Sequence, residues 1–324
     1  MRRALRWAGI TLGLGVLALV TLAPREPVEM GATFEPRKFG EGVGVYLEAM
    51  ESRFDDIRDG AQKRIVWAGP RETRTPLSIV YVHGFSASSE EIRPVPDRVA
   101  EALGANLFFT RLSGHGRGAE AMGEPRVGDW MQDMAEALAV GRAIGEEVIV
   151  IGTSTGATLA HAALFDAAMA ENIRGVVLIS PNYGINNPMA PLLTWPGARQ
   201  WLPLVAGARR SFEPQNAGHA KFWTTEYPST AVFPMAALVA HVRGMDHASL
   251  SVPALFYYDD GDQVVRPDLT DGVVAHWGGA ATRGRPVLTE TDDRFAHVVA
   301  GDILSPGNTG RAVEEIVAWV KKLE

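Results

Sequence analysis

Cysteine is absent from the sequence. The chain therefore forms no disulfide, has no thiol nucleophile and offers no thiolate to a metal ion. Because proteins of reducing and of oxidising compartments can both lack cysteine, this absence does not indicate where the protein works.

An excess of basic charge is also lacking. The chain has 31 Lys and Arg against 38 Asp and Glu, which gives a net charge of −7. A protein that binds nucleic acid needs a basic face for the phosphates. The composition therefore argues against nucleic acid as a partner and favours a small neutral substrate.

Motifs for metals and nucleotides are missing as well. Four histidines form neither an HExxH pair nor another metal-ligand spacing, and packing in helices or loops accounts for them. They are His161, His219, His241 and His247. No glycine cluster with GxGxxG or P-loop spacing follows an expected strand, so neither a metal nor a cofactor is expected.

The first 24 residues have the pattern of an export segment. Three arginines within the first six residues precede residues 7–23, which carry no charge. A signal peptide cleaved after Ala23 and an uncleaved membrane anchor both remain open, and Pro24 favours the anchor because proline at that point resists processing. Since positive charge keeps such an N-terminus cytoplasmic, we expect the rest of the chain in the cell envelope, outside the cytoplasmic membrane.

The remainder reads as a linker over residues 25–44 and one α/β domain over residues 45–324. A chain of 324 residues that is 46% hydrophobic can bury a large core and accommodate an insertion. Continuous β-branched runs alternate with helical stretches, which indicates a parallel sheet. The expected strands are residues 77–83, 106–110, 148–151, 176–180, 254–258 and 286–290, followed by a closing helix over 309–323.

Residues 182–252 differ from the rest of the chain in composition and hydrophobic pattern. They hold seven of the 20 prolines and three tryptophans, Trp195, Trp201 and Trp223, without a clear strand period. We expect an inserted helical cap over the ends of the strands, where ligands of open α/β sheets bind. The tryptophans either contact the substrate or close a small core of the cap.

Ser154 is the central residue of the pentapeptide Gly-Thr-Ser-Thr-Gly, residues 152–156. The apolar run 148–151 precedes it and an alanine-rich helical stretch follows it. This context is typical of a nucleophile elbow, in which a sharp strand-to-helix turn presents the serine hydroxyl and flanking glycines allow close packing. An ordinary turn serine is the alternative.

A serine nucleophile needs a base, and imidazole can change its protonation state near neutral pH. If the chain order is serine, acid, histidine, only His276 and His297 lie far enough downstream. His276 falls inside an expected helix over residues 268–277. We therefore assign the base to His297, which follows the last expected strand.

The carboxylate that orients the base should follow the strand 254–258. Asp259, Asp260 and Asp262 compete for this position. Asp262 precedes Val264 and Val265, which would fix the loop, whereas the other two resemble solvated turn residues. We assign the acid to Asp262.

Charge on the attacked carbonyl oxygen requires hydrogen-bond donors that already point toward it. The backbone amide of Phe85, just after the strand 77–83, and that of Thr155, at the start of the expected helix, would form such an oxyanion hole. His83 is expected to pack beneath this loop.

Together these residues resemble the α/β-hydrolase superfamily, in particular its carboxylesterase and monoacylglycerol-lipase branch, over residues 77–322. The similarity rests on His83-Gly84-Phe85, on residues 111–116 and 152–156, on Asp262 with the three residues after it, and on His297. It implies a mainly parallel eight-stranded sheet flanked by helices, a cap and no cofactor. It also places His115 in a structural loop near the site.

The sequence departs from that branch beside the nucleophile. Many of its esterases carry His or Met there, whereas this chain has Thr153 and Thr155. The resemblance therefore does not determine the subfamily or the substrate. The serine at position 154 does exclude the dehalogenases, because their nucleophile is an aspartate.

We expect a serine hydrolase that cleaves medium-chain acyl esters or monoglyceride-like esters through an acyl-serine intermediate. Acyl transfer, thioester hydrolysis, amide cleavage and carbon–carbon bond hydrolysis on the same residues are alternatives, because fold does not choose among them. A catalytically silent binding protein is a third reading. The oligomeric state is left open.

Overall fold

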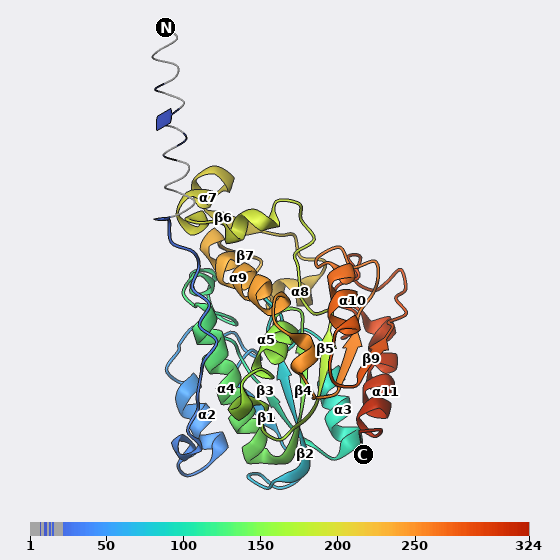
Figure 1. The fold of residues 1–324 in the computed structure, drawn as a ribbon. Coiled ribbons are helices and arrows are strands. Elements are labelled where there is room, and N and C mark those ends of the chain that lie inside the picture. The colour runs from blue at the N-terminus through green and yellow to red at the C-terminus, as the bar shows by residue number, and fades with distance from the viewer. Residues whose placement is uncertain (1–6, 8–9, 12, 14, 16–21, 324) are drawn as a thin grey trace.

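A mainly parallel sheet of seven strands runs through the chain (Figure 1), in the order β1-β3-β2-β4-β5-β8-β9. The structure, a computed structural model, describes residues 7, 10–11, 13, 15 and 22–323. Only β1 is antiparallel to its neighbour, β3. The strands are β1 (Arg64–Val66), β2 (Thr75–Val82), β3 (Asn106–Phe109), β4 (Gly145–Thr153), β5 (Ile173–Ile179), β8 (Ala254–Tyr257) and β9 (Ala281–Gly284).

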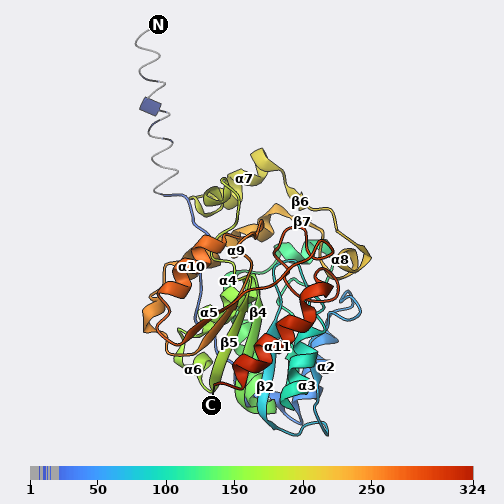
Figure 2. The same cartoon turned by 90° about the vertical axis from the view of Figure 1, so that its right-hand side faces the viewer.

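Helices cover both faces of this sheet. They are α2 (Val43–Glu51), α3 (Val95–Leu103), α4 (Val127–Ile144), α5 (Thr155–Ala163), α6 (Ala167–Ala170), α10 (Pro267–Ala275) and α11 (Thr309–Val320), with short 3₁₀ turns η1 (Pro36–Phe39), η2 (Ala119–Gly123) and η6 (Pro306–Asn308). In β4, Val148 and Val150 pack with α4 and α5, whereas Ile149 and Ile151 pack with α3 and α11. Figure 2 shows α3 and α11 side by side on one face. Because both of their faces are largely buried, the central strands β2, β3, β4, β5 and β8 carry long apolar runs, which is why the sequence revealed them. The edge strand β1 is partly exposed and was not predicted.

The segment between β5 and β8 lies over the carboxyl ends of the strands, at the top of Figure 1. It contains η3 (Ala190–Thr194), α7 (Ala198–Ala206), β6 (Arg209–Ser211), α8 (Ala217–Phe222), β7 (Glu226–Pro228), η4 (Ser229–Ala231), α9 (Val232–Arg243) and η5 (His247–Ser249). We call residues 182–252 the cap. Its strands β6 and β7 form a separate antiparallel pair.

Residues 25–44 pack against the domain. Val28, Met30 and Phe34 lie against the core on the α4 side of the sheet, and Gln132 of α4 donates a hydrogen bond to the Thr33 carbonyl. The helix α2 already begins at Val43.

Two expectations about the sheet need correction. Within residues 22–323 the sheet has seven strands, not the eight that the resemblance implied, because the chain before β1 runs along α4 instead of adding a strand. The last strand is β9, not residues 286–290, which have no strand geometry. Its Ala-Thr-Arg-Gly sequence is short, lies at the sheet edge and is exposed at two of its four residues, so it lacks the buried β-branched pattern of the central strands.

The expected leader or anchor, residues 1–24, falls mostly outside the residues described. Among those that are described, no helix is long and apolar enough to cross a bilayer.

Candidate active site

Ser154 lies at the sharp turn between β4 and α5. Its backbone has φ 51° and ψ −116°, a region that non-glycine residues rarely adopt, and its N–H donates to the Ile179 carbonyl at 2.9 Å. A Cβ on Gly156 would lie 2.2 Å from the Val82 carbonyl oxygen, and one on Gly152 would lie 2.7 Å from Ala157. The two glycines therefore allow the close approach of helix and strands that such a turn requires.

His297 and Asp262 complete a hydrogen-bonded chain with this serine. Nε2 of His297 is 3.1 Å from Oγ of Ser154, and Nδ1 is 2.8 Å from Oδ2 of Asp262. The second oxygen of Asp262 accepts the N–H groups of Val264 and Val265 at 2.8 and 2.9 Å. The structure thus brings together the three residues that the sequence assigned as nucleophile, base and acid.

The surroundings of His297 raise the pKa of its ring. Burial lowers its pKa, but the charge of Asp262 and its hydrogen bond more than offset burial, so the pKa is raised above the ordinary 6.5. Since Asp262 is buried and bonded to two amides, its negative charge has a fixed position next to Nδ1. This arrangement stabilises the imidazolium that forms when a base takes the serine proton.

The competing residues lie elsewhere. His276 follows α10 and its Nδ1 is bonded to the Gly272 carbonyl oxygen. Asp260 forms ion pairs with Arg283 and Arg285, and Asp259 caps its own turn at the Gly261 N–H. None of the three reaches Ser154.

The amides of Phe85 and Thr155 flank the nucleophile. Both residues line the same cavity as Ser154, and Thr155 is the first residue of α5. Within the described part of the chain, neither amide donates a hydrogen bond to another protein group. Both amides are therefore without a protein acceptor, and their role as an oxyanion hole stays a prediction.

His83 and His115 support this loop from below. Nε2 of His83 accepts the Leu112 N–H at 3.1 Å, and Nδ1 is 2.9 Å from the Gly84 carbonyl oxygen. This pattern requires the neutral ring with its proton on Nδ1, and burial lowers the pKa of His83 well below 6.5. The ring of His115 packs 5.0 Å from that of His83, so both side chains are structural.

A cavity of about 750 Å³ opens above the triad. Apolar cap side chains form much of its wall: Leu192, Leu193, Leu202, Trp223, Tyr227, Val232 and Met235. Charged and polar groups also reach it: Glu91, Arg210, Glu213, Gln215, Asp293 and Arg294. Of the three cap tryptophans only Trp223 lines the cavity, whereas Trp201 packs within the cap and Trp195 is 53% exposed.

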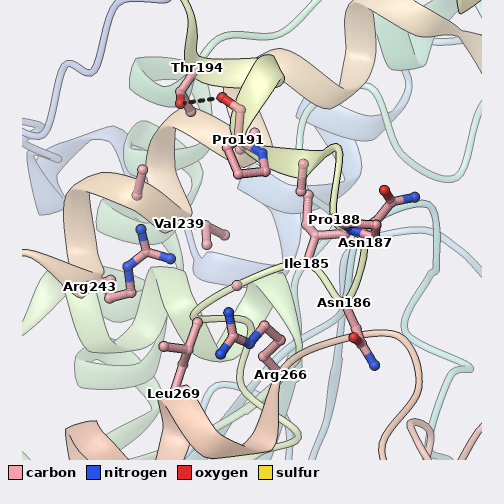
Figure 3. A pocket seen from close by; sticks show the side chains of 14 residues that line it. Ile185, Asn186, Asn187, Pro188, Pro191, Thr194, Val239, Arg243, Arg266 and Leu269 are labelled. Atoms are coloured by element: carbon pink, nitrogen blue, oxygen red, sulfur yellow. Dashed lines mark hydrogen bonds between the residues drawn. The ribbon is translucent and has the colours of Figure 1, made fainter.

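A second, smaller cavity of about 460 Å³ lies between the cap and α10. Figure 3 shows the guanidinium groups of Arg243 and Arg266 in it. Ile185, Asn187 and Ala190 line both cavities, but none of the five predicted site residues lines this one. Four of the five, Phe85, Ser154, Thr155 and His297, line the larger cavity instead.

Two carboxylates of the site were not recognised in the sequence. Asp293 accepts the N–H groups of His297 and Val298 at 3.0 and 2.9 Å and so holds the loop that carries the base. Its position four residues before His297 was the available signal. Glu91 contacts the Gly84 N–H from seven residues further along the same connection between β2 and α3, and nothing in its sequence context indicates that contact.

A strained serine with a histidine and a buried aspartate at these distances defines a serine hydrolase site on an α/β sheet. The chain matches the family Hydrolase_4, described as serine aminopeptidase S33, over residues 74–283, and it belongs to that family. The match includes Ser154 and Asp262 and ends before His297, whose placement rests on geometry.

Relatives support the same class. The thermostable monoacylglycerol lipase of Bacillus sp. (strain H-257) is 25% identical over 197 residues, which cover 60% of this chain and 74% of that protein. Among solved structures, one from work on LipS and LipT, two metagenome-derived lipolytic enzymes, has a TM-score of 0.66 at 18% identity and covers 82% of this chain and 99% of its own. A soluble variant of monoglyceride lipase from Saccharomyces cerevisiae, in complex with a substrate analog, has a TM-score of 0.62 at 12% identity, with 82% and 92% covered. At these identities the solved structures show the shared α/β-hydrolase fold.

Proposed function

We propose that the protein hydrolyses carboxylic esters of medium-chain or monoglyceride-like type through an acyl-serine intermediate. The observation that carries the proposal is the hydrogen-bonded chain Ser154–His297–Asp262 below a cavity with a largely apolar cap wall. The named lipases among its relatives support the same substrate class.

The reaction follows from the positions of these groups. Nε2 of His297 takes the proton as Oγ of Ser154 attacks the ester carbonyl, and the amides of Phe85 and Thr155 receive the charge on the carbonyl oxygen. The carbon–oxygen bond to the alcohol breaks, and the imidazolium gives its proton to the leaving alcohol. Water then attacks the acyl-serine with His297 again as base, which releases the carboxylic acid and restores the serine.

The cap supports an apolar acyl group. Its leucines and Met235 line the cavity opposite the nucleophile, and the volume of about 750 Å³ lies in the range of sites that enclose a small molecule. The cap also exposes Leu204 and Val205, at 84% and 74%, next to its cavity-lining residue Ala206. Apolar surface beside an opening suits a substrate that comes from a lipid phase.

Turnover of p-nitrophenyl esters with acyl chains of 2 to 16 carbons tests the proposal. We expect the highest kcat/KM at intermediate length and turnover of a monoacylglycerol of that length. Amides and thioesters with the same acyl group test amide cleavage and thioester hydrolysis. An acceptor alcohol added to the ester reaction tests acyl transfer. The proposal fails if none of the esters is hydrolysed, or if amide cleavage exceeds ester cleavage.

We also propose that the protein works in the cell envelope. The arginines before residue 7 and the uncharged run 7–23 support this location. Fractionation of cells that express a C-terminally tagged full chain tests it, and recovery of the protein only from the cytosol would contradict it.

A further inference from the structure

Glu91 is a buried carboxyl group next to the nucleophile that the proposed reaction does not use. It lies in the turn region between β2 and α3, is only 2% exposed and lines the catalytic cavity. No cationic side chain of the described residues forms an ion pair with it. Burial of an unpaired carboxyl is costly, so a group kept in such a place requires an explanation.

One oxygen of this carboxyl group links the loop that carries Phe85 to β2 and, through the Tyr81 hydroxyl, to the end of β4. Oε2 accepts the Gly84 N–H at 2.7 Å, and Gly84 directly precedes the oxyanion residue Phe85. The same oxygen accepts the Tyr81 hydroxyl at 3.0 Å. The Tyr81 oxygen is in turn 3.2 Å from Oγ1 of Thr153, the residue before the nucleophile.

Packing places the carboxyl close to the reacting atoms. A Cβ on Gly84 would lie 2.8 Å from Oε1 of Glu91 and 3.3 Å from Cβ of Ser154. The α-carbon of Gly84 is thus held between Glu91 and the nucleophile. Loss of the carboxyl would leave the Gly84 amide without its partner and give the oxyanion loop room to move.

The charge of Glu91 varies near neutral pH. Burial raises the pKa of Glu91 to about 7, although the bonds from Gly84 and Tyr81 and the nearby His297 act in the opposite direction. The titratable groups that face it are Tyr81 from β2 and His297 from the loop after β9. Its negative charge in turn contributes to the raised pKa of His297.

We propose that Glu91 is a positioning residue for ester cleavage, which holds the Phe85 amide in place through Gly84 and acts electrostatically on His297. This inference rests on the proposed function for its reaction, but its test does not depend on an ester. A fluorophosphonate probe reports on the same atoms, because Oγ of Ser154 attacks phosphorus, fluoride leaves, His297 takes the serine proton and the phosphoryl oxygen occupies the oxyanion hole.

The experiment compares three variants with the wild-type full chain. E91Q keeps an acceptor for the Gly84 N–H but carries no charge, whereas E91L has similar volume and no acceptor. E90Q is the matched control, because Glu90 is the adjacent glutamate and instead pairs with Arg64 and Arg93. The rate of probe labelling is measured from pH 5 to 9, with kcat, KM and Tm at pH 8.

We expect E91L to label about 10- to 100-fold more slowly and to lose kcat rather than KM, since part of one oxyanion contact is lost. E91Q should label at near the wild-type rate at pH 8. Its acid limb should shift to lower pH by roughly half a unit to one unit and follow a single ionisation, because the coupled carboxyl is gone. E90Q should reproduce the wild-type profile.

The inference is overturned if folded E91L labels within twofold of wild type, or if the E91Q profile superimposes on that of wild type. Should E91L fail to fold, the E91Q profile alone decides. A wild-type protein that labels but hydrolyses no ester refutes the proposed function and leaves this test intact. Wild-type ester turnover with an E91Q profile like that of wild type refutes only the role of Glu91.

Discussion

At the scale of single residues, the triad depends on the protonation state of His297. Only the neutral ring can take the serine proton, and Asp262 raises the pKa of the ring above 6.5. Activity should therefore rise with pH, with its midpoint above pH 6.5. As a stability effect, the pair contributes fully below pH 6.5 and its contribution is lost as pH rises through the raised pKa.

The variant Asp262→Asn should lower kcat by about 10²- to 10⁴-fold and move this midpoint to lower pH, because the ring loses its charged partner and its fixed tautomer. Asp259→Asn is the control, since that side chain only caps a turn. Rate profiles from pH 5 to 9 check both. Equal midpoints for wild type and Asp262→Asn would show that the carboxylate does not act on His297.

Glu91 gives a second pH effect, on folding. Its pKa is raised from 4.5 to about 7, so the folded state binds a proton more tightly than the unfolded state. The stabilisation that this proton gives is complete below pH 4.5 and is lost as pH rises to about 7, a change of about 3 kcal/mol. The free energy of unfolding, measured with urea, should therefore fall between pH 4.5 and 7 by more in wild type than in E91Q. Equal pH dependence of the two proteins would contradict this effect.

At the scale of secondary-structure elements, the elbow depends on close contact between α5 and the end of β2. Gly156→Ala should destabilise the protein by roughly 2–4 kcal/mol, because its Cβ would lie 2.2 Å from the Val82 carbonyl oxygen. Gly272→Ala in α10 meets nothing within 4 Å and should stabilise by up to about 1 kcal/mol. Urea denaturation distinguishes them, and equal effects would mean that the elbow is not tightly packed.

The cap should determine acyl-chain length. Leu193→Trp adds bulk inside the catalytic cavity and should lower kcat/KM for decanoyl esters about tenfold while butyryl esters change little. Val45→Trp, at a 54%-exposed position of α2 that lines neither cavity, is the control and should leave the length profile unchanged. If Leu193→Trp left the length profile unchanged, the cap would not form the binding site for the acyl chain.

At the scale of the whole molecule, parallel strands bring the site together. Ser154, Asp262 and His297 span more than 140 positions of the sequence. All three nevertheless lie at the carboxyl ends of the strands of one sheet. The pentapeptide around Ser154 and the order of serine, acid and histidine along the chain predicted that they meet, although the strand expected just before His297 was wrong. The sequence did not predict Glu91, because that contact depends on how the turn after β2 folds back onto Gly84.

The difference between local sequence patterns and tertiary contacts also explains why the last strand and the number of strands were predicted wrongly. Buried strands such as β4 and β5 carry a strong apolar signal, whereas the exposed edge strand β9 does not. The chain before β1 packs along α4 through side-chain contacts that no local pattern encodes. Local patterns thus identified the core strands and the three residues that the structure brings together, while the edges of the sheet depended on tertiary contacts.

Mass spectrometry of the protein during turnover of p-nitrophenyl octanoate, first intact and then after digestion to peptides, tests the central claim most directly. We predict a single added acyl group on the peptide that contains Ser154, and neither the adduct nor turnover in Ser154→Ala. Turnover that persists in Ser154→Ala, or an acyl group on another residue, would contradict this account.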